Sequence, residues 1–193
     1  MPLDWTYAWA ICVTGVVLVT ASVTDVRRGM IYNWLTYPAC LVGLVGHTMV
    51  GGLTGEANTS IGLVGSLLGL LVGFGPMLIA WLAGGINGGD AKLMGAVGAL
   101  TGWPFTLSAM FYGFAAAALL SVAVMIRRRI FLATMKRILR FLYLSVSPNR
   151  PGDPSTPESP KIPFGLALCI GSAAACVEFF LLGKDAFAWP FGG

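Results

Sequence analysis

The sequence GGINGGDAKLMGAVGAL, residues 84–100, joins two apolar segments and carries an acidic residue, Asp90, behind four glycines. An ionised carboxylate near hydrocarbon is costly, so such a residue usually has a partner or a task. The apolar run that follows, from Lys92 to Trp103, is too short to cross a bilayer unless neighbouring helices shield its ends. We therefore expect a short, shielded fourth helix with Asp90 at its start.

The composition predicts a membrane protein. Of the 193 residues, 56% are hydrophobic and only 10% are charged, whereas soluble domains have roughly 25% charged residues. A spanning helix needs about 20 apolar residues, and besides the short fourth run the chain has five longer ones: 5–24, 32–50, 61–83, 105–126 and 162–182. We predict an all-α, polytopic fold of about six transmembrane helices in a single domain, residues 1–193.

The positions of the basic residues predict how these helices are oriented. No Lys or Arg precedes the first apolar run, whereas Arg27 and Arg28 follow it directly. Because positively charged loops tend to stay cytoplasmic, the N-terminus is expected outside, and a cleaved secretory signal is not expected. Six alternating spans then place all of the basic residues except Lys184 in the cytoplasm. This asymmetry explains the net charge of +4 without nucleic acid as a partner.

The segment between the fifth and last spans differs from the spans in its composition. Residues 127–147 place four basic residues along one face of a predicted helix: Arg129, Lys136, Arg137 and Arg140. This pattern is typical of a helix lying in the cytoplasmic interface against anionic membrane lipids; a plain positive-inside anchor or a docking surface for an acidic partner are the alternatives. Residues 148–160 are rich in proline and polar residues, which predicts a flexible cytoplasmic loop.

Several residues inside the spans are expected to be structural. Gly65, Gly69 and Gly73 recur every four residues, which favours a groove for helix packing over a groove for substrate. His47 is expected to bond a neighbouring helix, and Glu178 is expected to be structural as well.

Two carboxylates remain as candidates for catalysis. On the predicted topology Asp25 and Asp90 lie on different helices at the same cytoplasmic depth. Two carboxyl groups within a few ångströms share a proton, so one acts as a base toward water and the other as an acid toward a carbonyl. That pair hydrolyses a peptide bond without metal or covalent intermediate. The alternative is that Asp25 caps the segment after it and Asp90 caps the fourth helix.

The charge state of Asp90 also follows from its expected position. The positive end of the helix dipole and nearby Lys92 favour an ionised Asp90, which leaves Asp25 as the expected holder of the shared proton.

Other catalytic chemistries find no support in the residues. The single histidine lies at the other end of the predicted bundle, and neither G-x-S-x-G nor H-E-x-x-H occurs. The cysteines form no C-x-x-C pair and have no histidine at ligand spacing; they are Cys12, Cys40, Cys169 and Cys176. We expect no metal, no cofactor and no disulfide framework.

Three ordered segments carry a family resemblance: TDVRRGMIYNWLT at 24–36, GGDAKLMGAVGAL at 88–100 and KIPFGLAL at 161–168. Together they resemble the type IV prepilin peptidases, which are membrane aspartyl proteases with a G-x-G-D motif. The similarity is greatest to the short single-domain members of the TadV and CpaA type, which serve tight-adherence (Flp) pili.

The resemblance implies that Asp25 and Asp90 are the catalytic pair of a leader peptidase. Its substrate would be an Flp-type prepilin whose short basic leader is cut at the cytoplasmic face of a prokaryotic inner membrane, and the pilus assembly machinery is a further possible partner. Proteolysis alone is expected, without the methylation carried out by larger members. Substrate-binding or loop-shaping roles are implied for Asn33, Asn87, Gly88, Gly89, Lys92, Pro163 and Gly165.

Two departures from the family pattern affect the expected site. Asn87 replaces the first glycine of G-x-G-D, and Tyr32 stands where the family usually has proline. Asn tolerates left-handed backbone, so the turn is expected to survive with Asn87 in that conformation. Two other functions stay open at this point: a small proton-coupled transporter, and a non-catalytic platform subunit for pilus assembly.

Overall fold

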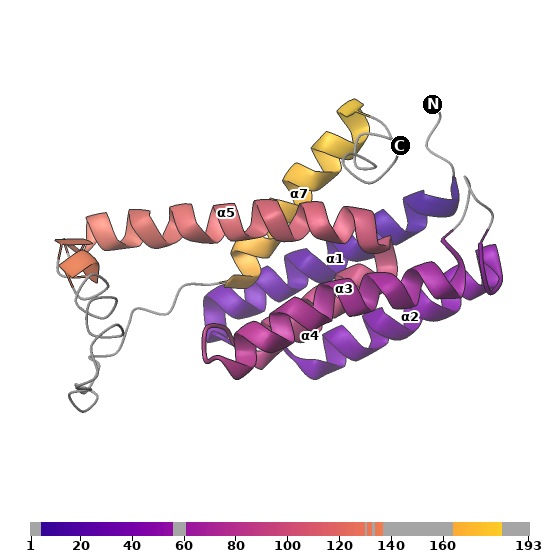
Figure 1. The fold of residues 1–193 in the computed structure, drawn as a ribbon, viewed down its shortest axis with the longest axis horizontal. Helices are drawn as coiled ribbons and strands as arrows, with labels where there is room; N and C mark the ends of the chain where they lie inside the picture. The colour runs from indigo at the N-terminus through magenta and orange to yellow at the C-terminus, as the bar shows by residue number, and fades with distance from the viewer. Residues whose placement is uncertain (1–4, 56–60, 130, 133, 137–163, 183–193) are drawn as a thin grey trace, which may run out of the picture. The chain divides into compact units, whose positions relative to one another are not determined.

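The computed structural model describes residues 5–55, 61–129, 131–132, 134–136 and 164–182 (Figure 1). Within these ranges the secondary structure is helical and contains no strand, which confirms the all-α prediction. The helices are α1 (Trp5–Arg28), α2 (Asn33–Gly51), α3 (Gly62–Leu82), α4 (Gly88–Thr101), α5 (Trp103–Arg127) and α7 (Phe164–Leu182).

Three segments among the described residues are long and apolar enough to cross a membrane. They are Ala8–Arg28 within α1, Gly62–Leu82 and Trp103–Arg127. A shorter apolar segment, Phe164–Phe179, lies in α7. Large apolar side chains such as Leu71 and Phe111 are exposed on these helices, as lipid-facing residues are. The prediction of a membrane protein is confirmed, whereas the six-span count and the orientation stay predictions.

The chain divides into two compact units, residues 1–116 with 163–193, and residues 117–162. In the second unit, α5 ends at Arg127 and Arg129 adopts a left-handed conformation, with φ of 56°. Residues 131–132 and 134–136 are helical. The rest of the predicted interfacial helix, 127–147, and the whole predicted loop, 148–160, lie outside the described residues. The single-domain organisation also stays a prediction.

Helix α4 forms the centre of the first unit, where α1, α2 and α3 all pack against it (Figure 1). Its 14 residues span only about 20 Å at 1.5 Å per residue, less than the roughly 30 Å of bilayer hydrocarbon. Leu93, Met94, Val97 and Leu100 are completely buried. Other helices therefore shield this short helix, as its length required.

Glycines let α4 approach its neighbours at backbone distance. A Cβ atom on Gly69 of α3 would collide with the carbonyl oxygen of Gly98 in α4, and a Cβ on Gly98 would collide with that of Gly69. A Cβ on Gly43 of α2 would lie 2.7 Å from the Ala99 carbonyl. Gly73 faces the Met94 carbonyl in the same way. The packing interpretation is thus confirmed for Gly69 and Gly73.

Gly65, the third member of that series, makes a different contact. A Cβ there would meet the side chain of Ile61, in the preceding turn of the same segment. The absence of a Cβ atom at Gly65 therefore makes room for the Ile61 side chain rather than for α4.

Hydrogen bonds between helices satisfy several of the buried polar groups. The Nε2 atom of His47 lies 2.7 Å from the carbonyl oxygen of Leu100, and the Ser66 hydroxyl donates to the Ala99 carbonyl at 2.6 Å. On the other side of the unit the Ser108 hydroxyl donates to Glu178 Oε2 at 3.1 Å. These contacts agree with structural roles for His47 and Glu178.

A capping box sets the start of α4. The Asn87 side chain accepts a hydrogen bond from the backbone N–H of Asp90, and the Asp90 side chain accepts one from the N–H of Asn87. Asn87 has φ of −83° and ψ of 149°, an extended conformation, so the expectation of a left-handed Asn87 is wrong. The left-handed residue of the preceding turn is Gly84, with φ of 77°.

We expect Gly98→Ala to lower the free energy of unfolding by about 1–3 kcal/mol, the usual cost of overpacking. The added methyl meets the backbone of α3, which cannot rotate away as a side chain would. Thermal unfolding in detergent measures the loss. Gly75→Ala is the control because a Cβ at Gly75 meets nothing within 4 Å; equal stability of the two variants would contradict the close approach.

A second prediction concerns the cap. Asn87→Ala removes the acceptor for the Asp90 N–H and is expected to cost about 1 kcal/mol of stability, whereas Asn87→Gly is expected to cost only a few tenths. Comparing the melting temperatures of the two variants tests this difference. Equal losses would show that the cap does not contribute.

Candidate active site

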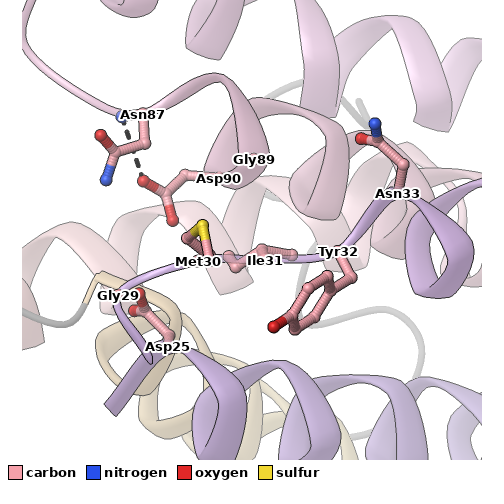
Figure 2. Close-up of a pocket in the computed structure, with 9 residues that line it drawn as sticks. All are labelled: Asp25, Gly29, Met30, Ile31, Tyr32, Asn33, Asn87, Gly89 and Asp90. Atoms are coloured by element: carbon pink, nitrogen blue, oxygen red, sulfur yellow. Dashed lines mark hydrogen bonds between the residues drawn. The ribbon is translucent and has the colours of Figure 1, made fainter. Parts of the chain in front are cut away.

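A pocket of about 310 Å³ opens beside the start of α4 (Figure 2). It is formed by the end of α1, the connection to α2 and the first turn of α4 with its cap. Its lining residues are Asp25, Gly29, Met30, Ile31, Tyr32, Asn33, Asn87, Gly89 and Asp90. The two aspartates singled out in the sequence therefore line one cavity, although 64 intervening residues separate them.

Asp25 lies in the last turns of α1, which continues to Arg28. Its side chain is 7% exposed, and its Oδ2 accepts a hydrogen bond of 2.7 Å from the backbone N–H of Gly165, the second residue of α7. The N-cap of α2 is Tyr32, with no side-chain cap bond. The alternative in which Asp25 caps the segment after α1 is therefore wrong.

Asp90 occupies the third position of α4 and is only 2% exposed. Its Oδ2 accepts a hydrogen bond of 3.2 Å from the N–H of Asn87, so the capping alternative holds for this residue. The second carboxylate oxygen remains on the pocket side (Figure 2). Capping and exposure to the pocket are thus compatible in one side chain.

The charge state expected for Asp90 is corrected by its burial. Burial, together with the negative charge of Asp25, raises the pKa of Asp90 to about 6, although the bond from Asn87 acts to lower it. Lys92 does not offset these effects: its Nζ donates to Asn33 Oδ1 at 2.9 Å and lies 5.3 Å from the centre of the Tyr37 ring. Desolvation therefore outweighs the helix N-terminus, and Asp90 ionises less readily than the helix dipole and Lys92 led us to expect.

The remaining glycines of the motif have packing roles. Gly88 and Gly89 are the first residues of α4; a Cβ on Gly88 would press on the Trp81 indole at 3.3 Å, and one on Gly89 would lie 3.1 Å from Ile31 Cβ. They belong to a packed helix start rather than to an adaptable loop. Gly165 contacts Asp25, and Pro163 lies outside the described residues.

Sequence reasoning missed the wall opposite α4. Met30, Ile31 and Tyr32 line the pocket, and the Tyr32 hydroxyl accepts a hydrogen bond of 2.7 Å from the Arg28 guanidinium. Gly29, with φ of 64°, ends α1 and turns the chain into this wall. The sequence did contain a signal for the turn at Gly29, because a glycine directly after a basic helix end is a common C-terminal cap. No group of three or more His, Cys, Asp or Glu suited to a metal occurs in the part of the chain that the structure describes.

Comparison with known proteins gives a match to the part of the chain that forms the pocket. Residues 12–122, more than half of the chain, match the model of the type IV leader peptidase family. No curated protein and no solved structure gives a significant match. The matched residues include Asp25, Asp90 and the whole wall of the pocket. The chain therefore belongs to the type IV leader peptidase family, and it is a membrane protease of the aspartic type that cleaves prepilin leaders.

Proposed function

We propose that Asp25 and Asp90 are the catalytic pair of this leader peptidase. The observation that carries the proposal is their convergence on one pocket from α1 and α4 (Figure 2). Both carboxylates are largely buried and each accepts one backbone N–H bond. Neighbouring buried carboxylates resist ionising together, and a pair that holds one proton is the state from which a peptide bond is hydrolysed.

The chemistry needs only the pair and a water molecule. The ionised carboxylate takes a proton from water as the oxygen attacks the scissile carbonyl carbon, while the protonated carboxyl gives its proton to the carbonyl oxygen. As the tetrahedral intermediate collapses and the carbon–nitrogen bond breaks, the carboxylate that gave up its proton takes one from a hydroxyl of the intermediate, and the other carboxyl gives its proton to the departing amine. The cycle restores one proton shared between two carboxylates.

We propose that the substrate is a small prepilin of the Flp type. The pocket lies at the end of α1, a helix whose apolar segment is long enough to span the membrane and which ends in Arg27 and Arg28. A basic end favours the cytoplasmic side, which in a prokaryote is the inner face of the inner membrane. The prepilin's apolar helix would lie in the bilayer, with its leader in the cytoplasm and its scissile bond at the pocket.

Family membership favours this function over the two rivals. A proton-coupled transporter and a platform subunit for pilus assembly both remained open from residues alone, but the family match belongs to peptidases. Contacts with the assembly machinery are compatible with a peptidase and form a separate proposal.

We expect Asp25→Asn and Asp90→Asn each to reduce leader removal by at least about a hundredfold, since each removes one partner of acid–base catalysis. Co-expression with a prepilin from the same source measures processing as a shift in gel mobility. Glu178→Gln is the matched control, because its carboxylate bonds Ser108 outside the pocket. Full processing by either aspartate variant at normal membrane levels would remove the pair from the mechanism.

The pH profile provides a separate prediction. Because Asp90 has a pKa raised to about 6 in the presence of the Asp25 charge, the pair loses its last proton near that pH. We expect kcat/KM, measured with purified protein and a prepilin in detergent, to fall about tenfold for each pH unit above 6. Activity that stays constant up to pH 8 would contradict the shared proton.

A further inference from the structure

One hydrogen bond of the site has no part in the mechanism above. The N–H of Gly165 donates to Asp25 Oδ2 at 2.7 Å, within a buried contact between α7 and α1. N–H groups in the first turn of a helix have no acceptor in their own helix, and they carry the positive end of its dipole. Residue 165 lies beyond the matched residues 12–122, in the segment 161–168 that carries the third part of the sequence resemblance.

The approach of Gly165 to Asp25 requires the absence of a side chain. A Cβ atom at residue 165 would lie 3.0 Å from Asp25 Oδ2 and 3.1 Å from Asp25 Cβ. The register of α7 is fixed further along by Gly171, where a Cβ would collide with the backbone of Gly113 in α5. Leu168, completely buried, packs beside Gly113. The position of this N–H is therefore set by the packing of α7.

The two aspartates differ in how they are held. Asp25 receives the shorter bond, 2.7 Å against 3.2 Å for Asp90, and keeps slightly more exposure, 7% against 2%. A short bond from an N–H to a carboxylate stabilises the ionised form. With Oδ2 occupied by this bond, Asp25 Oδ1 is the oxygen left to accept a proton.

We infer that Gly165 is a positioning residue whose backbone N–H keeps Asp25 ionised and oriented, so that Asp25 takes the proton from water and Asp90 protonates the carbonyl oxygen. The assignment rests on the proposed function and reverses the expectation that Asp25 holds the shared proton. It makes the first turn of α7 part of the active site.

Gly165→Ala tests the inference through the pH profile. The added methyl pushes the Asp25 carboxylate off the N–H, so the acid limb of kcat/KM should move up by about one pH unit, with a loss of about tenfold at pH values on that limb. The alkaline limb should stay in place, since Asp90 keeps its own contacts. Gly15→Ala, on the same helix as Asp25 and with nothing within 4 Å of the added Cβ, should match the parent.

Two outcomes of this experiment would overturn the inference. A uniform loss of rate with both limbs unmoved would show that Gly165 only supports packing. Movement of the alkaline limb alone would show that Asp25 is the acid.

A second measurement does not depend on how Gly165→Ala folds. In the parent protein labelled with ¹³C at aspartate carboxyls, Asp25→Asn and Asp90→Asn identify the two resonances, and Asp25 should ionise at the lower pH. The reverse order would overturn the assignment. If the order is reversed but both Asn variants are inactive, the catalytic pair is still supported and only the assignment of roles fails. Failure of this inference is therefore distinguishable from failure of the proposed function.

Discussion

The structure depends on the contact of α4 with its neighbours at backbone distance. A helix of 14 residues cannot satisfy its ends in hydrocarbon, so other protein must enclose it. Gly43 on α2, Gly69 on α3 and Gly98 on α4 itself remove the side chains that would hold the helices apart. Without a hydrophobic driving force between helices in lipid, such close packing is what stabilises the bundle. The enclosed helix in turn fixes the position and direction of Asp90 within the bundle.

Enclosure also explains the electrostatics of the pocket. At the start of an exposed helix Asp90 would be expected to ionise easily, since the dipole favours negative charge there. Here the helix start is inside protein, and burial together with the charge of Asp25 raises the pKa of Asp90 to about 6. The same capping box that begins α4 also orients this carboxylate, because its Oδ2 is bound to Asn87. Helix initiation and orientation of this carboxylate are thus achieved by one contact.

The sequence predicted the helices and the acidic pair but not how the pair is held. Apolar run lengths placed each described helix within a few residues, and the short run after Asp90 indicated an enclosed helix. The conformation of Asn87 was predicted wrongly, because its capping role depends on the hydrogen bonds of a formed helix start. The partner of Lys92 was also missed, since Asn33 lies 59 residues away. The Gly165 contact depends on tertiary packing across 140 residues, which no local pattern encodes.

The positions of both aspartates depend on close contacts made at glycines, and one of these glycines lies outside the G-x-G-D motif. In the motif, Gly88 and Gly89 permit the start of α4 to pack against Trp81 and Ile31. This packing fixes the position of Asp90. In α7, Gly165 permits a backbone N–H to reach Asp25. A Cβ atom on Gly89 or Gly165 would displace a pocket wall or a carboxylate by a few tenths of an ångström, and the acid–base catalysis proposed for this pair tolerates little displacement of its groups. The glycines of this site therefore act by close approach, with the two carboxylates fixed on packed helices rather than on adaptable loops.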